Sequence, residues 1–274
     1  MPAPDSTDRR QATAREDLLA CADLVVLGRM PWSSNATFLC ELWPAGSRPD
    51  AGLTDEDSDD DDDEMEDVGA TPRLGGPGPL GRAIYKPHRG ERPLWDFPDG
   101  LYLREVAAYD LACAISWDVV PPTVLKDGPF GLGSLQWFIE ADFDQHYFTL
   151  LEDEATHAQL RRMAAFDVVA NSTDRKGGHV LVDADRHLWG IDNGLCLHAE
   201  FKLRTVIWDF GGEPLPADLA DDLDRFLQVE LTPELAVVID PFERDALRTR
   251  ARALLTDGCL PVDPTGRRFP WPLV

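Results

Sequence analysis

The chain has 274 residues, enough for a two-lobed domain with a sizeable core, and 43% of them are hydrophobic. Its formal net charge is −24; residues 55–67 hold eleven acidic side chains and no basic one, so the remainder still carries −13. This balance argues against a nucleic-acid partner, which needs clustered lysine and arginine, and against stable association with an anionic membrane.

The cysteines and the N-terminal sequence indicate a reducing compartment. The five cysteines are scattered, form no C-x-x-C pair and lie in or beside apolar sequence, as buried reduced thiols do. Residues 1–15 are polar and lack the apolar core of a signal peptide, and no apolar run approaches the length of a membrane span. We therefore expect a cytoplasmic protein.

The first predicted elements belong to a small antiparallel sheet. Residues 1–14 are predicted as a loose polar lead, and residues 16–21 favour a short helix. The apolar runs 23–30 and 36–42 then predict two strands of a hairpin. Their connection contains Ser33-Ser34-Asn35, whose hydroxyls and backbone N–H groups could bind phosphate oxygens; an ordinary polar turn is the alternative.

Residues 45–80 change the character of the chain. They are rich in glycine and proline around the acidic block at 55–67 and have no face that could be buried. We predict a disordered insertion between two strands of one sheet. It is either a tolerated solvated segment or a regulatory tail.

The next strand and helix carry a lysine and a glutamate that could act together. Residues 83–86 predict a strand that ends at Lys86, before a proline. Residues 101–117 predict a helix with one apolar stripe, from which Glu105 projects to the other side. A cation at the end of such a strand suits nucleotide phosphates, and a carboxylate on the next helix could hold it in place.

A hinge is predicted where the sheet ends. Residues 119–126 are a strand candidate interrupted by two prolines, and residues 134–140 follow as a mostly apolar strand. The backbone of Gln136, Trp137 and Phe138 would then face an adenine between an N-terminal lobe, residues 1–135, and a C-terminal lobe, residues 136–274.

The C-terminal part is predicted to be mainly helical. Helices are expected over residues 157–169, 216–229 and 233–255. Asp167, near the end of the first, is expected to be buried and hydrogen-bonded. The last helix carries arginines that suggest a solvated surface, Arg244, Arg248, Arg250 and Arg252. The tail, residues 269–274, cannot be helical and could cap a groove.

Two carboxylates flank a predicted hairpin. Residues 180–182 and 188–191 favour two short strands; Asp174 precedes the first and Asp192 follows the second, 18 residues later. His179 comes five positions after Asp174. In protein kinases, a catalytic aspartate, a metal-binding side chain five positions later and a second, metal-binding aspartate before a glycine have this spacing.

Four motifs in this order resemble the phosphatidylinositol 3-/4-kinase-like superfamily, with the closest similarity to type II phosphatidylinositol 4-kinases and the small bacterial proteins grouped with them. They are Tyr85-Lys86-Pro87, Arg104-Glu105-Val106-Ala107-Ala108-Tyr109, Asn171-Ser172-Thr173-Asp174-Arg175 and Ile191-Asp192-Asn193-Gly194-Leu195. The resemblance implies an α+β, two-lobed protein-kinase-like fold, with a small antiparallel-sheet lobe carrying one helix and a mainly helical second lobe.

The resemblance also implies an ATP-dependent phosphotransferase that uses Mg²⁺ or Mn²⁺. Asp174 would orient or deprotonate the acceptor hydroxyl, and Lys176 would neutralise charge on the phosphoryl group in transfer. Asp192 would hold the metal, and Lys86 the nucleotide phosphates. The family usually has asparagine at the position of His179, so this histidine either hydrogen-bonds a phosphate or gives the site a preference for Mn²⁺.

The acceptor and the activity leave alternatives open. No basic surface is evident for a phosphoinositide headgroup, which favours a protein hydroxyl or a soluble metabolite over a lipid. A nucleotide-binding pseudokinase and an AMP-transferring enzyme are the alternatives. A metal hydrolase is disfavoured because its candidate ligands lack helical spacing and alternate along a hairpin: His179, Asp183, Asp185, His187 and His198.

Overall fold

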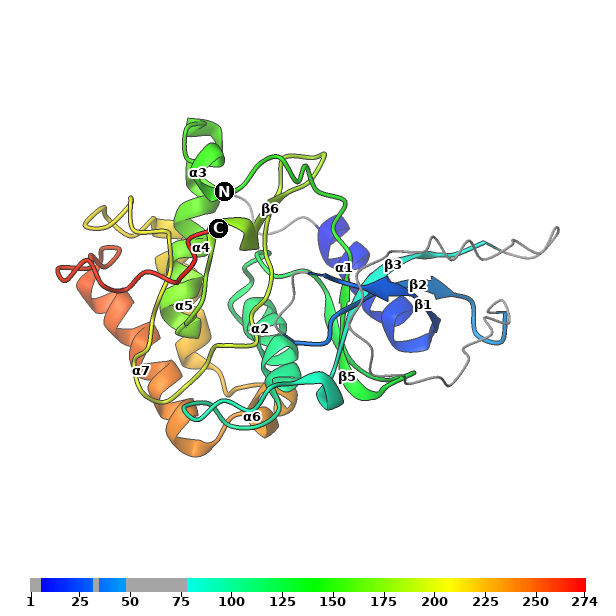
Figure 1. The fold of residues 1–274 in the computed structure, drawn as a ribbon. Coiled ribbons are helices and arrows are strands. Elements are labelled where there is room, and N and C mark those ends of the chain that lie inside the picture. Colours follow the sequence, from blue (N-terminus) through cyan, green and yellow to red (C-terminus); the bar gives the residue numbers. More distant parts are fainter. Residues whose placement is uncertain (1–5, 32–34, 48–77) are drawn as a thin grey trace.

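The computed structural model describes residues 6–31, 35–47 and 78–274, with side chains from residue 11 onward (Figure 1). Ser33, Ser34 and the acidic block at 55–67 lie outside these ranges, so the predictions made for them stay predictions. Figure 1 shows the large sheet on one side of the molecule and most of the helices on the other, with α2 between them.

Within the described ranges, the sheet has five strands and is antiparallel throughout. Their order across the sheet is β1 (Asp23–Arg29), β2 (Phe38–Trp43), β3 (Gly81–Pro87), β5 (Gly131–Trp137) and β4 (Thr123–Gly128). The long insertion therefore joins two paired strands, β2 and β3, as predicted. A segment of any length can be accommodated there, because the pairing register is set by the strands on either side.

Alternation along β3 separates the two faces of the sheet. Ala83 and Tyr85 are fully buried and pack with Leu19 of α1 (Ser6–Cys21) in a core of their own. Lys86 has the opposite orientation and reaches α2. Helix α1 is longer than the short helix predicted at 16–21. The expected loose lead is wrong for residues 6–14, which are helical.

Helix α2 (Leu101–Ile115) is buried almost all round, whereas the sequence predicts a single apolar stripe. One side contacts β4 and β5, and the other contacts helices of the second lobe. Arg104 and Glu105 are 4% and 3% exposed, so both charges lie inside the protein. The helix begins after Gly100, whose φ of +89° suits glycine. An element held from both sides can position a functional side chain precisely enough for chemistry.

Asp110 of α2 gives a pH-dependent prediction. Its Oδ2 is buried and has no hydrogen-bond partner in the described part of the chain. Burial, followed by the charges of Glu234 and Glu16, raises the pKa of Asp110 to about 6. Because the folded-state pKa is raised, the carboxylate costs stability above pH 6, and this cost disappears as the pH falls towards 4.

Asp110→Asn is therefore expected to stabilise the fold at pH 7.5 by roughly 2 kcal/mol, and by almost nothing at pH 4. Urea unfolding of both proteins at the two pH values measures this difference. Asp144→Asn, at an exposed aspartate, is the matched control and should change little at either pH. Equal gains at pH 4 and pH 7.5 would show that charge burial is not the cause.

The second lobe holds the larger hydrophobic core. It contains the small hairpin of β6 (Val180–Val182) and β7 (Leu188–Gly190), and five helices: α3 (Tyr147–Leu150), α4 (His157–Ala170), α5 (Ala217–Gln228), α6 (Pro233–Val238) and α7 (Pro241–Asp257). The α+β class and the division into a small antiparallel-sheet lobe and a mainly helical lobe, both predicted from the sequence, are confirmed. No helix in the described ranges is long and apolar enough to cross a membrane.

Two predictions for the C-terminal helices are wrong. The single helix expected at 233–255 is divided, because Pro241 cannot continue α6 and Asp240 caps α7 by accepting the N–H of Glu243 at 2.8 Å. Arg250, expected on a solvated surface, is 8% exposed and donates to the backbone oxygens of Val169 and His198. The tail is not helical, as predicted.

Candidate active site

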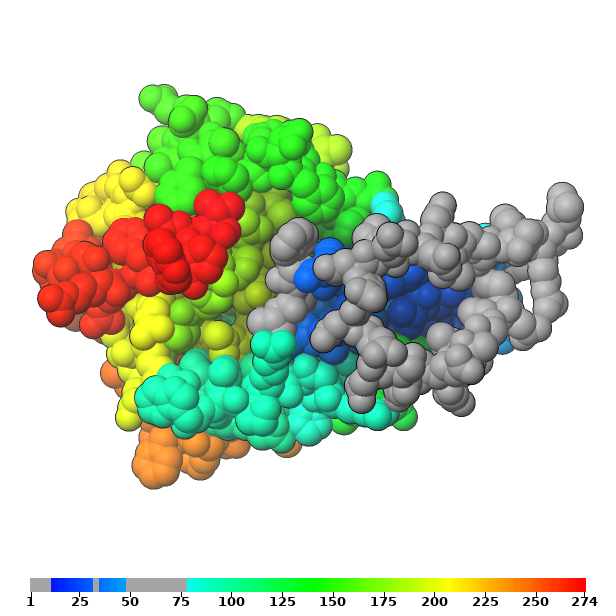
Figure 2. All heavy atoms as spheres, in the orientation of Figure 1, coloured from blue at the N-terminus to red at the C-terminus, as the bar shows by residue number. Residues whose placement is uncertain are grey.

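The four motif segments meet in one cleft of about 300 Å³ between the sheet and the helical lobe. Its lining includes Asn35 after the first hairpin turn, Lys86 from β3 and Glu105 from α2. The helical lobe contributes the loop after α4 and the segment after β7 through Asp174, Lys176, His179 and Asp192. Figure 2 shows a hollow on this face, bordered by the turquoise segment before α2 and the red C-terminal tail.

Lys86 joins the two lobes. Its Nζ donates to Glu105 Oε1 and, at 2.7 Å, to Asp192 Oδ1. Burial by itself would lower the pKa of Lys86, but the carboxylates of Asp192 and Glu105 outweigh it and raise the pKa above its usual value. The ammonium group therefore stays charged, as the binding of phosphate oxygens requires.

A buried hydrogen-bond network fixes the position of the loop after α4 relative to Glu105. The second oxygen of Glu105 accepts the backbone N–H of Asn193 at 2.9 Å. Arg175 donates to Asn193 Oδ1 at 2.6 Å, to the backbone oxygen of Ile191 at 2.7 Å and to Asp167 at 3.0 Å. Asp167 is fully buried and hydrogen-bonded, as predicted. These contacts fix the segments that carry Asp174 and Asp192 relative to α2.

Asp192 has an unusual backbone and a strongly perturbed carboxyl group. Its φ is +57°, in the left-handed region that aspartate tolerates better than most residues. The adjacent ammonium of Lys86, more than any other group, lowers the pKa of Asp192 far below its usual value, against the effect of burial. The carboxylate is therefore ionised at any pH at which the protein would work.

His179 faces this carboxylate. It ends a short 3₁₀ turn, Gly177–His179, with Nδ1 3.0 Å from the backbone oxygen of Asp174 and Nε2 3.4 Å from Asp192 Oδ2. Burial lowers the pKa of His179 to about 4, although Asp192 opposes the shift, so the ring is neutral at neutral pH. Nδ1 lies close both to the backbone oxygen of Asp174 and, at 3.4 Å, to the backbone N–H of Lys176. In the tautomer whose proton is on Nδ1, Nε2 presents a lone pair to the carboxylate of Asp192.

This donor set fits a divalent cation. A neutral imidazole nitrogen and a carboxylate oxygen that face one another both act as ligands, and a positive ion between them would satisfy both. Imidazole suits Mn²⁺ or Zn²⁺ better than Mg²⁺, which prefers oxygen. Asp192 and His179 are thus the residues that would hold the metal.

Asp174 has the character expected of a base. Burial raises the pKa of its carboxyl group, and the hydrogen bond and charge of Lys176 partly oppose this effect. Lys176 Nζ lies 3.0 Å from Asp174 Oδ2. A carboxylate that is half-desolvated yet held by a cation can accept a proton from a hydroxyl group brought within hydrogen-bond reach.

The predicted adenine hinge does not line this cleft. Gln136 is buried on β5 and donates to Thr123 Oγ1 at 2.9 Å. The backbone N–H of Trp137 donates to Pro122, and that of Phe138 to Arg82. Adenine binding by this segment stays a prediction. The backbone N–H groups of Trp137 and Phe138 already donate hydrogen bonds within the protein.

One cation in the cleft was not expected from the sequence. Arg92 lines the cleft, and its backbone N–H donates to Asn35 Oδ1 at 3.0 Å, which ties the first hairpin turn to the loop before α2. No sequence pattern marks Arg92 as a site residue, because it lies in an aperiodic, proline-rich stretch. Its guanidinium is a further candidate for phosphate binding.

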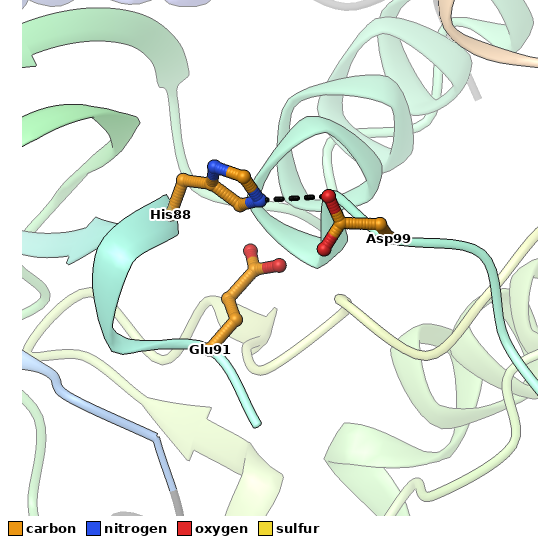
Figure 3. A group of neighbouring side chains, drawn as sticks. All are labelled: His88, Glu91 and Asp99. Carbon is orange, nitrogen blue, oxygen red and sulfur yellow. Dashed lines mark hydrogen bonds and ion pairs between the residues drawn. The ribbon is translucent and has the colours of Figure 1, made fainter. Parts of the chain in front are cut away.

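A second group of ligand-type side chains lies at the start of α2, shown in Figure 3. His88, Glu91 and Asp99 offer one atom each within 4.8 Å of one another. His88 Nε2 pairs with Asp99 at 2.9 Å, and the two oxygens of Glu91 accept the backbone N–H groups of Leu101 and Tyr102. Because Glu91 is engaged with the positive end of a helix, this group serves to hold the start of α2.

Comparison with known proteins finds a similar sequence and, among solved structures, similar folds. No family model matches the chain. Protein Rv2133c of Mycobacterium tuberculosis (strain ATCC 25618 / H37Rv) is 37% identical over an alignment 305 positions long, which covers 95% of this chain and 96% of that protein.

The first solved structure is a Golgi casein kinase, 12% identical with a TM-score of 0.46, over 91% of this chain and 75% of that one. The second is the Helicobacter pylori proinflammatory kinase CtkA, 9% identical with a TM-score of 0.44, over 88% and 94% of the two chains.

Proposed function

This chain belongs to the same family as Protein Rv2133c, and from the geometry of its cleft we propose that it is an ATP- and divalent-metal-dependent phosphotransferase. One observation carries the proposal: Lys86 is bonded at once to Glu105 on α2 and to Asp192, in a cleft that also contains Asp174. A structural ion pair would not need a second carboxylate and a base in an open cleft. The order of the motifs further supports membership of the phosphatidylinositol 3-/4-kinase-like superfamily.

Each residue then has a defined task. Lys86, held by Glu105, binds nucleotide phosphates, and Arg92 and Asn35 border the same space. Asp192 and His179 hold the metal, which neutralises phosphate charge when bound. Asp174 accepts the proton of the acceptor hydroxyl, and Lys176 stabilises negative charge that develops beside it.

We propose that the acceptor is a protein hydroxyl or a soluble small molecule in the cytoplasm. The chain is acidic overall, so a phosphoinositide headgroup, a nucleic acid and an anionic membrane surface would all be repelled at long range. A pseudokinase would form no product, and an AMP-transferring enzyme would transfer an adenylyl group. One assay of the products therefore separates both alternatives from this proposal.

The test combines calorimetry with product analysis. Titration with a non-hydrolysable ATP analogue, in Mg²⁺ and separately in Mn²⁺, is expected to show metal-dependent binding. Incubation with ATP and analysis by intact mass should show transfer of a phosphoryl group, to this protein or to an added acceptor, with ADP as the other product. Transfer of an adenylyl group would identify the AMP-transfer alternative, and binding without product the pseudokinase. No binding in either metal would overturn the proposal.

His179 makes the metal comparison informative. We expect greater turnover in Mn²⁺ than in Mg²⁺, and we expect His179→Asn to reverse this order because an amide oxygen suits Mg²⁺. Equal or greater turnover of the unmodified protein in Mg²⁺ would contradict the manganese preference without affecting the assignment of Asp192.

A further inference from the structure

A second cavity, of about 480 Å³, lies at the C-terminal end of α2. Its walls come from α1, from the last turns of α2 and from the turn between β6 and β7. Its volume falls in the range of small-molecule sites, roughly 300–1,000 Å³. None of the residues assigned to the nucleotide cleft lines it.

The apolar part of this cavity is aromatic. Tyr109, Trp117 and Trp189 line it and are 6%, 2% and 5% exposed. His187 lies against Trp189 with ring centroids 4.3 Å apart and ring planes tilted by 53°, and its Nε2 lies 2.8 Å from the backbone oxygen of Asp118. Aromatic rings in a cavity wall can attract the apolar body of a ligand and a positive charge placed over a ring face.

The charge around the cavity is negative. Glu16, Asp118, Asp183 and Asp185 line it, against Arg15 and the partly exposed His187. The guanidinium of Arg15 is already stacked 5.2 Å from the centre of the Trp137 ring. Burial first, and the charges of Glu16, Asp110 and Asp118 besides, raise the pKa of the Cys113 thiol at the cavity wall to about 11. Two of the four carboxylates that line the cavity, Glu16 and Asp118, thus act on this thiol.

The backbone also adds negative potential to this cavity. Helix α2 ends at Ile115, so the negative end of its dipole points to this region, where Ser116 closes the helix in a left-handed conformation. Aromatic walls, an acidic lining and a helix C-terminus all favour a cation and disfavour an anion such as ATP.

We propose that this cavity binds a small organic cation, an ammonium or guanidinium group on an aromatic or aliphatic body. The ring faces would cover the body, and the carboxylates would neutralise the charge. Because Cys113 and Glu105 lie eight residues apart on one helix, about 12 Å along its axis, occupancy would bear on the position of Glu105 and so on the proposed nucleotide cleft. Binding itself does not depend on catalysis, so it can be tested whether or not the protein transfers phosphate.

Three indole compounds of similar size separate charge from shape: tryptamine as the cation, 3-ethylindole as the neutral form and indole-3-propionate as the anion. Calorimetric titration of the full chain is expected to rank them in that order, with tryptamine at least about tenfold tighter than the neutral compound. Binding of the anion as tight as that of tryptamine, or no binding of tryptamine, would overturn the proposal.

Two variants and their controls locate the site. Cys113→Trp should fill the cavity and abolish tryptamine binding, whereas Cys21→Trp, at an exposed cysteine outside it, should not. Asp185→Lys should weaken binding about tenfold, and Asp144→Lys, at an exposed aspartate elsewhere, should leave it unchanged. Thermal unfolding confirms that each variant is folded. If Cys113→Trp does not fold, the comparison of Asp185→Lys with Asp144→Lys still decides the test. Tryptamine binding that survives both cavity variants would place it elsewhere.

Discussion

Asp174→Asn is expected to abolish phosphoryl transfer while nucleotide binding stays within about threefold of the unmodified protein. Asp174 lies beside Lys176 and not beside Lys86, so its carboxylate is positioned for the acceptor rather than for the nucleotide. Removal of a general base typically costs about 10²–10⁴ in rate. Asp192→Asn is expected to abolish metal-dependent nucleotide binding itself, because it removes the ligand opposite His179 and the partner of Lys86.

The two substitutions are isosteric, so calorimetry with an ATP analogue and a turnover assay can compare them directly. The expected pattern is binding without turnover for Asp174→Asn and neither for Asp192→Asn. Asp144→Asn, at an exposed aspartate, should match the unmodified protein in both measurements. Full turnover by Asp174→Asn would remove Asp174 from the reaction, and unchanged metal-dependent binding by Asp192→Asn would remove Asp192 from the metal site.

Glu243→Gln is expected to destabilise the fold by about 3–5 kcal/mol, the usual cost of breaking a buried ion pair from one side. Glu243 of α7 and Arg104 of α2 are 4% exposed each, with Arg104 Nη2 2.7 Å from Glu243 Oε1. Arg104 also donates to the backbone oxygen of Cys196 at 2.7 Å, just beyond the Asp192 segment. The pair therefore holds α2 against the helical lobe, one residue from Glu105.

Urea unfolding measures this loss, and Glu140→Gln is the matched control. Glu140 pairs with Arg82 at the same distance, 2.7 Å, but its side chain is 78% exposed, so less than about 1 kcal/mol is expected. If Glu243 acts as a positioning residue as well, its substitution should raise the KM for ATP more than it lowers kcat, because Glu105 would hold Lys86 less firmly. Equal effects of the two substitutions on stability would contradict the importance of the buried pair.

Local sequence determined the secondary-structure elements and identified the candidate functional residues. The apolar runs at residues 23–30 and 36–42, the polar turn between residues 182 and 188 and the periodicity of residues 157–169 each predict an element that the structure contains. These signals are short-range, since they depend on side-chain period and turn residues. Lys86, Glu105, Asp174 and Asp192 could be selected for the same reason, because each belongs to a motif a few residues long.

Only the tertiary structure decided how these residues meet. The sequence predicts one buried stripe on α2, but a sheet and a helical lobe cover both its sides and bury Arg104 with Glu105. The guanidinium of Arg250 can be buried because it donates hydrogen bonds to the backbone oxygens of Val169 and His198, which are far away in sequence. The second cavity likewise combines α1, α2 and the β6–β7 turn. Burial and long-range hydrogen bonds depend on what packs from outside a segment, and no local pattern records that.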